Sequence, residues 1–97
     1  MEKKIVDKLF DLIKDRKNNP VPGSYTCSLF EKGKEEILSK VEEEALEVIH
    51  ASREETAERL IAELADLYYH ILVLMAEEGI SLKDIEEELK VRSEANK

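Results

Sequence analysis

The 97-residue sequence contains no tryptophan, one cysteine, two prolines and three glycines, and aromatic residues make up only 5% of it. The single thiol, Cys27, cannot form a disulfide within the chain, which favours a reducing compartment such as the cytoplasm. So few aromatic residues argue against a large stacking surface. The longest uninterrupted apolar run, residues 71–76, is far too short to span a bilayer. The opening "MEKKIVDKLF" also lacks the apolar core of a secretory signal. We therefore expect a soluble, cytoplasmic protein.

Positive charge is also in short supply. The chain has 15 basic and 23 acidic residues, giving a formal net charge of −8, and its basic residues are not concentrated in any stretch. Such a chain is a poor candidate for binding a nucleic-acid backbone or an anionic membrane surface. A phosphate-bearing small molecule remains a possible partner, provided that a cation mediates the contact.

What is abundant is helix-forming residues. Apolar residues make up 42% of the sequence, and Leu, Ile, Ala, Glu and Lys dominate, which is typical of an all-α protein. The length predicts a single domain over residues 1–97. Apolar residues at helical spacing predict four to five helices. They cover about residues 2–17, a region from Thr26 or Ser28 to about His50 that Gly33 interrupts, residues 54–78, and a last segment that begins after Ser81.

The ends of these helices carry recognisable signals. The loop "KNNPVPGS" over residues 17–24 ends the first helix. Ser52 and Glu55 read as a capping box, and Gly79 is placed to end the helix that follows. Residues 34–50 and 54–78 then form a central antiparallel pair. Its apolar faces are broader than one short partner helix can cover, so we expect the pair to complete an intersubunit helix bundle in a homodimer or higher homo-oligomer.

Two acidic pairs lie at the margins of these apolar faces. In "KVEEEALEV", Glu44 falls inside the apolar stripe of its helix, and Glu47 lies at the edge of that stripe. On the following helix, Glu63 and Asp66 in "ELAD" occupy the corresponding flank. Most such pairs belong to a solvated helix face. These differ because they touch the stripes that must pack together, where carboxylates repel one another at low dielectric.

Three remedies exist for such a cluster: protonation, a nearby cation such as Lys40, or a metal ion. One ammonium group is too little for four or five carboxylates. Oxygen-only ligands suit Mg²⁺ or Mn²⁺, and an Mg²⁺ site commonly takes its remaining ligands from water and substrate phosphates. The spacing alone leaves a metal site and a solvated face both open.

Two longer stretches carry a family resemblance. "GSYTCSLFEKGKEEILSKVEEEALEVIHA" and "ELADLYYHILVLMAEEGISLKDIEEEL" resemble the phosphoribosyl-ATP pyrophosphohydrolases of histidine biosynthesis, which are MazG-like all-α nucleotide pyrophosphohydrolases. The resemblance covers about residues 20–90. It implies Mg²⁺-dependent hydrolysis of phosphoribosyl-ATP to phosphoribosyl-AMP and pyrophosphate, in a homodimer or larger assembly.

The resemblance also implies roles for individual residues. The metal ligands would be Glu44, Glu47, Glu63 and Asp66. Glu43 would be a further ligand or would orient the attacking water, and Lys40 would meet the triphosphate. Ser24, Tyr25 and Thr26 would help shape the substrate site. Glu42 stands where members of the family usually have glycine, which bears on how closely a neighbouring subunit approaches there.

Two other functions stay open beside this one: a house-cleaning nucleoside triphosphate pyrophosphohydrolase of the same superfamily, and a non-enzymatic acidic helical adaptor for a basic partner.

Among the remaining residues, His70 is either a proton shuttle or, as we expect, a boundary histidine bonded to a carboxylate such as that of Asp66. Tyr68 is expected in the core, and Tyr69 at the surface or an interface.

Overall fold

The computed structural model describes residues 4–96, and within this range it contains five α-helices and no β-strand. The helices are α1 (Ile5–Asn18), α2 (Tyr25–Lys32), α3 (Lys34–Glu54), α4 (Ala57–Glu78) and α5 (Leu82–Ala95). The all-α prediction is confirmed, with the larger of the two expected helix numbers. The first helix was expected over residues 2–17; of these, residues 2 and 3 lie outside the described range.

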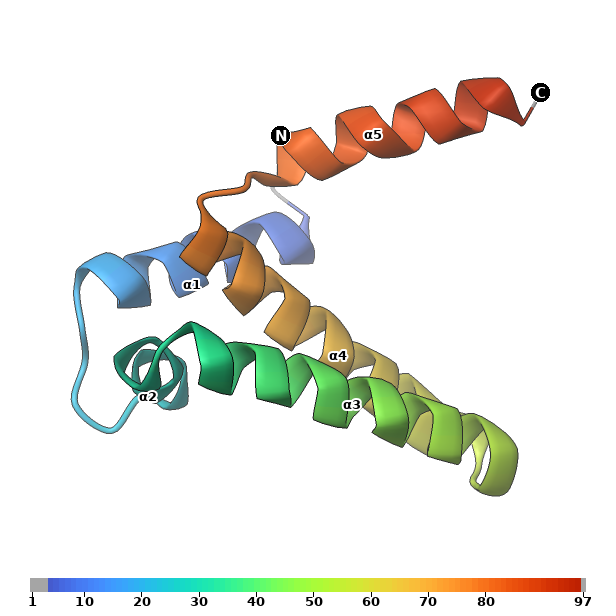
Figure 1. The fold of residues 1–97 in the computed structure, drawn as a ribbon, viewed down its shortest axis with the longest axis horizontal. Coiled ribbons are helices and arrows are strands. Elements are labelled where there is room, and N and C mark those ends of the chain that lie inside the picture. The colour runs from blue at the N-terminus through green and yellow to red at the C-terminus, as the bar shows by residue number, and fades with distance from the viewer. Residues whose placement is uncertain (1–3, 97) are drawn as a thin grey trace.

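Helices α3 and α4 form the antiparallel pair that the sequence predicts, and they share the most extensive contact of the fold (Figure 1). Helix α1 packs against α4, and the short α2 packs against both α1 and α3. Helix α5 projects away from the other four helices after a short turn (Figure 1). The structure therefore has a hairpin of long helices, covered at one end by α1 and α2.

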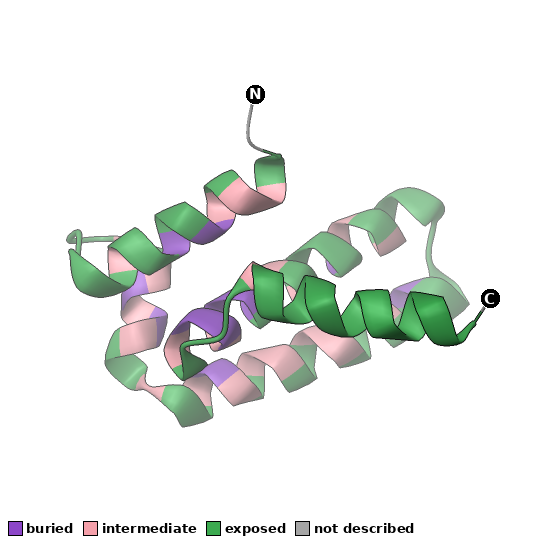
Figure 2. Ribbon diagram, turned by 90° about the horizontal axis from the view of Figure 1, so that it is seen from above, coloured by how far each residue is buried: buried purple, intermediate pink, exposed green. Residues whose placement is uncertain are grey.

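The core lies at that covered end of the hairpin. Its buried residues come from four helices: Phe10, Ile13, Leu29, Ile37, Leu72, Val73, Met75 and Ala76. Burying each large aliphatic side chain contributes about 1.5–3 kcal/mol. In contrast, α5 contains no buried residue and is drawn as exposed along nearly its whole length (Figure 2). The core thus holds one end of the α3–α4 hairpin in place. The middle of the hairpin stays open to solvent on one side.

Lys17 joins α1 to the end of α4. Its ammonium group donates to the backbone carbonyl of Ala76 at 3.1 Å and lies 3.7 Å from the Glu77 carboxylate. A cation at a helix C-terminus interacts favourably with the helix dipole. Gly79, at φ +72°, ends α4 as predicted, and the Gly79 and Ile80 amides donate to the carbonyls of Ala76 and Met75. These contacts fix where α4 stops and how α1 covers it.

Two of the predicted helix starts are wrong. The predicted cap of α4, Ser52, lies inside α3, because α3 does not end near His50 but continues to Glu54. Helix α4 instead begins after Thr56, whose hydroxyl accepts from the Arg59 amide. The last turn of α3 persists because Ala51 is fully buried and its carbonyl accepts from the Glu55 amide. Likewise, the cap of α2 is Ser24, neither Thr26 nor Ser28. The Ser81 cap of α5 is confirmed, as a capping box with Asp84.

The revised cap of α4 makes a prediction. Thr56→Ala should lower the free energy of unfolding by about 1 kcal/mol, because the Arg59 amide loses its acceptor. Ser52→Ala is the control, since an exposed serine within the last turn of α3 does not cap α4 and alanine favours helix; it should leave stability unchanged or slightly higher. Urea denaturation followed by circular dichroism measures both. The reverse order of effects would restore Ser52 as the cap.

None of the helices in the described part of the chain combines the length and the apolar character needed to cross a membrane.

Candidate active site

Three carboxylates meet at the middle of the α3–α4 hairpin. One side-chain oxygen from each of Glu44, Glu63 and Asp66 lies within 4.8 Å of the others. Glu44 comes from α3, while Glu63 and Asp66 come from one face of α4, three residues apart. Glu63 is only 6% exposed, whereas Glu44 is half-buried and Asp66 is exposed. The three residues, called the carboxylate cluster below, thus have a buried inner side and an open outer side.

The cluster has the composition and size of a site for a hard divalent cation. All three donors are carboxylate oxygens, which Mg²⁺ and Mn²⁺ prefer. Two oxygens on opposite sides of a bound Mg²⁺ are about 4.2 Å apart. The oxygens of the cluster already lie within 4.8 Å of one another, so small side-chain movements suffice to bind an ion. The exposed side at Asp66 leaves room for water and substrate oxygens.

The electrostatics of the cluster favour binding of a cation. The pKa of Glu44 is raised above its ordinary value, first because burial penalises its charged form and next because the Asp66 carboxylate repels it. His70 partly offsets this rise, and Glu63 and Glu43 add to it. An acid whose ionised form is disfavoured in this way gains from a nearby positive charge.

Arg59 is a residue of this site that the sequence reasoning missed. Its guanidinium donates to Glu63 and lies 3.7 Å from the Glu55 carboxylate. The signal was available, because Arg59 and Glu63 lie four residues apart on α4. Lys40 is therefore not the only cation near these acids. One guanidinium against three carboxylates still leaves the cluster negative.

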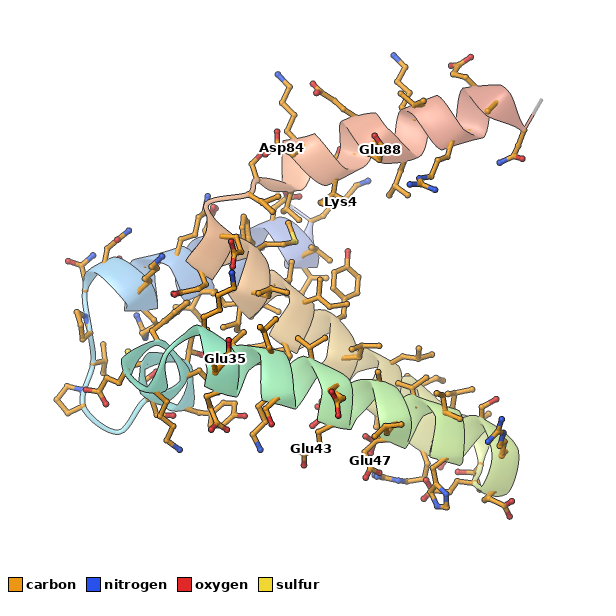
Figure 3. All side chains as sticks on the ribbon, viewed as in Figure 1. Lys4, Glu35, Glu43, Glu47, Asp84 and Glu88 are labelled. Carbon is orange, nitrogen blue, oxygen red and sulfur yellow. The ribbon has the colours of Figure 1, made fainter. Side chains whose placement is uncertain are left out.

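The other predicted acidic residues lie outside the cluster. Glu43 is exposed and bonded to Lys40, with the ammonium nitrogen 3.2 Å from the carboxylate oxygen. This bond raises the pKa of Lys40. Glu47 is exposed, one turn further along α3, and both glutamates project from the lower side of α3 in Figure 3. The roles of Glu43 as water-orienting group, Glu47 as ligand and Lys40 as triphosphate contact stay predictions.

The start of α2 is bonded to α4 beside the cluster. The Tyr25 hydroxyl lies 3.0 Å from Nε2 of His70, and Thr26 bonds to the Tyr69 hydroxyl. The rings of Tyr25 and Tyr69 stack, with centroids 6.4 Å apart. Burial raises the pKa of Tyr25, and Lys40 opposes this rise. Tyr25 and Thr26 thus reach the site through residues of α4.

Three side-chain expectations for α4 need correction. His70 is buried rather than at a boundary, and it bonds the backbone carbonyl of Asp66 at 2.7 Å, not its carboxylate. The expected positions of the two tyrosines are reversed. Tyr68, expected in the core, is 51% exposed, whereas Tyr69, expected at the surface, packs against the core. The reason is that α1 and α2 cover the Tyr69 side of α4, which the periodicity of α4 alone does not reveal.

A hollow of about 650 Å³ opens next to Tyr25, lined by the loop from Pro20 to Ser24 and by Tyr25, Cys27, Ser28 and Glu31. Ser24 caps α2, its hydroxyl accepting from the Cys27 amide at 3.2 Å. Gly23 takes a positive φ of +82° in the same loop. The hollow is of the size that small-molecule sites have. The predicted trio Ser24, Tyr25 and Thr26 therefore lies between this hollow and α4.

The site can be compared with known proteins. Residues 6–93 match the family model described as phosphoribosyl-ATP pyrophosphohydrolase. The chain belongs to this family. The match includes every residue of the carboxylate cluster as well as the loop and hollow, so the resemblance read from residues 20–90 is confirmed and extends back into α1.

Individual relatives agree with the family. A phosphoribosyl-ATP pyrophosphatase of Clostridium botulinum is 56% identical over 90 residues, which are 93% of this chain and 82% of the relative. One of Sulfurisphaera tokodaii is 53% identical over 95% of this chain and 98% of its own length. The histidine biosynthesis bifunctional protein HisIE of Caldanaerobacter subterraneus is 51% identical over 91% of this chain but only 43% of the relative. The same domain thus also occurs within a longer protein.

Proposed function

We propose that the protein hydrolyses the α–β phosphoanhydride of phosphoribosyl-ATP, giving phosphoribosyl-AMP and pyrophosphate in histidine biosynthesis. The observation that carries this proposal is the carboxylate cluster in a chain of this family: three oxygens within 4.8 Å, contributed by two antiparallel helices. Relatives of about the same length carry the name of this activity.

The cluster is the proposed binding site for Mg²⁺, with Mn²⁺ as a substitute. Glu44, Glu63 and Asp66 would hold the ion, and Glu47 would join them through a side-chain movement. A bound divalent ion supplies positive charge that polarises phosphoryl oxygens and offsets the charge on departing pyrophosphate. Arg59 would then share Glu63 with the ion, or move to Glu55, from which it is already 3.7 Å distant.

The remaining residues suit an anionic nucleotide. Lys40 lies on α3 one turn before Glu44 and is proposed to contact the triphosphate. Its bond to Glu43 would then break, freeing that carboxylate to orient the attacking water. Ser24 and Tyr25 border the 650 Å³ hollow, which is proposed to hold part of the nucleotide, and Thr26 lies beside them, bonded to Tyr69.

We further propose that the active form is a homodimer. A second hollow, of about 380 Å³, is lined only by apolar residues and tyrosine: Leu64, Leu67, Tyr68, Ile71, Met75, Leu82 and Ile85. Its lining contains no charge, so it does not suit a triphosphate. Helix α5, with 14 residues and none buried, is too short to be stable alone in water. A second copy of the chain would cover both the hollow and α5.

The cytoplasm is the proposed compartment, in keeping with one unpaired, buried cysteine.

The substrate assignment is tested with a panel. Phosphoribosyl-ATP, dATP and dUTP are each incubated with the protein, with Mg²⁺ or with excess chelator, and pyrophosphate release is measured. We expect rapid release from phosphoribosyl-ATP alone, and at least a hundredfold loss with the chelator, roughly the contribution of a catalytic metal ion. Comparable turnover of dATP or dUTP would instead indicate a general nucleoside triphosphate pyrophosphohydrolase. No metal-dependent turnover of any substrate would favour a non-enzymatic adaptor.

A further inference from the structure

His70 connects the carboxylate cluster to α2. It lies one helical turn after Asp66 on α4, and it is only 5% exposed. Nδ1 is 2.7 Å from the backbone carbonyl oxygen of Asp66, and Nε2 is 3.0 Å from the hydroxyl of Tyr25. Each ring nitrogen therefore has one partner, the first on α4 and the second on α2.

The first contact determines the direction of its hydrogen bond, and in a neutral ring it determines that of the second as well. A carbonyl oxygen can only accept, so Nδ1 of His70 must carry a proton. In the neutral ring, Nε2 is then an acceptor, and the Tyr25 hydroxyl donates to it. A tyrosine hydroxyl has a single proton. Because this proton points to His70, the Tyr25 oxygen can act toward any third group only as an acceptor.

The Tyr25 hydroxyl oxygen lies near charged groups of the proposed site. Tyr25 is half exposed and borders the larger hollow. The charges of Lys40, Glu44 and Glu43 all act on its hydroxyl. A phosphate oxygen cannot bond to this oxygen, because both are acceptors. A water molecule can, since it has protons to donate.

We infer that His70 is a positioning residue for the hydrolysis: it accepts the one hydrogen bond that Tyr25 can donate, and so presents the Tyr25 oxygen as a hydrogen-bond acceptor to a water molecule beside the carboxylate cluster. This inference rests on the proposed function for its kinetic consequences. A hydrogen bond from this water molecule to Tyr25 restricts the direction in which the water's lone pairs point. A water molecule without this restriction is less well aligned for attack, and misplacement of a reacting group costs about a hundredfold in rate.

Two substitutions of His70 separate its two hydrogen bonds. In His70→Asn, the amide nitrogen reaches the position of Nδ1 and keeps the bond to the Asp66 carbonyl, but nothing accepts from Tyr25. In His70→Gln, the amide oxygen reaches the position of Nε2 and still accepts from Tyr25. We expect His70→Asn to lower kcat about 10- to 100-fold with KM nearly unchanged, as Tyr25→Phe does, and His70→Gln to stay within about threefold of the native enzyme.

The double variant Tyr25→Phe/His70→Asn provides a further check. If both residues act through one hydrogen bond, the double variant should be no slower than either single variant. A purely structural His70 would behave differently. Asparagine and glutamine would then lower the melting temperature and kcat alike, or KM would rise, and the inference would be overturned.

A measurement on the metal-free protein tests the proton positions without any assay. Long-range ¹H–¹⁵N NMR spectra distinguish the two tautomers of a neutral imidazole. In spectra recorded at about pH 8.5, where a free imidazole is neutral, the Nδ1 tautomer is expected at position 70, and the exposed His50 serves as internal reference. A proton on Nε2 in an active enzyme overturns this inference alone. Absence of turnover by the native enzyme overturns both this inference and the proposed function.

Discussion

Glu44→Gln is expected to reduce kcat/KM for phosphoribosyl-ATP by at least about a thousandfold, because a neutral amide replaces one of the three carboxylates that would hold the metal ion. The oxygen of glutamine remains, but its charge is lost, and Mg²⁺ binds anionic oxygen far better than amide oxygen in a site with so few ligands. Steady-state kinetics at saturating Mg²⁺ measure the effect.

Glu42→Gln is the matched control. Glu42 lies two residues earlier on α3, carries the same charge and is exposed outside the carboxylate cluster. Its substitution should change kcat/KM by less than about threefold, as is usual for exposed positions away from a site. A Glu44→Gln variant that turns over substrate at near-native rates would remove Glu44 from the mechanism.

The same substitution should raise stability in the absence of metal. Because the pKa of Glu44 is raised in the folded protein, mainly by burial and next by Asp66, the folded state holds this proton more tightly than the unfolded state. The carboxyl therefore destabilises the fold increasingly as pH rises from its ordinary pKa through the raised value. With a chelator present, Glu44→Gln should unfold at higher urea than the native protein at pH 7. The difference should disappear below about pH 4, where the unfolded carboxyl is protonated as well. Equal stability at both pH values would contradict the pKa shift.

Leu64→Glu is expected to convert a dimer into a monomer, raising the dimer dissociation constant by at least about a hundredfold. Leu64 lines the apolar hollow between α4 and α5 and is 46% exposed in the single chain. A carboxylate there would have to be buried without a partner on association, at a cost of several kcal/mol. Sedimentation equilibrium over a range of protein concentrations measures the change.

Leu12→Glu is the control for this experiment. Leu12 is also 46% exposed but lies on α1 and does not line the hollow. Its substitution should leave the dissociation constant unchanged. A native protein that remains monomeric at high micromolar concentration would contradict the proposed dimer. Dissociation by Leu12→Glu, but not by Leu64→Glu, would place the interface on α1 instead.

The helices and their pairing could be predicted because they depend on patterns spread over many residues. Helical periodicity over α3 and α4, together with their short connection, fixes an antiparallel hairpin. The ends of helices depend on a few atoms. Ser52 and Glu55 fit a capping pattern, yet burial of Ala51 extends α3 past Ser52 to Glu54 and leaves the cap of α4 to Thr56. A local signal was thus overridden by tertiary packing.

The same distinction holds in the site. The angular position of Glu44 on its helix correctly indicated that it meets Glu63 and Asp66. Angle alone does not include displacement along the axis, and Glu47 lies about 4.5 Å further along α3, at 1.5 Å per residue. Arg59 was overlooked although its spacing to Glu63 was readable. The bonds of Tyr25 to His70 depend on how α2 meets α4, which no single segment encodes.

Binding of a divalent ion by the carboxylate cluster is the central claim, and it is tested most directly with crystals grown in Mn²⁺. Anomalous diffraction at the manganese absorption edge locates the ion without reference to activity. The account predicts a peak in contact with oxygens of Glu44, Glu63 and Asp66. Crystals that place manganese elsewhere, or that leave Glu63 bonded to Arg59 with no peak in the cluster, would contradict it.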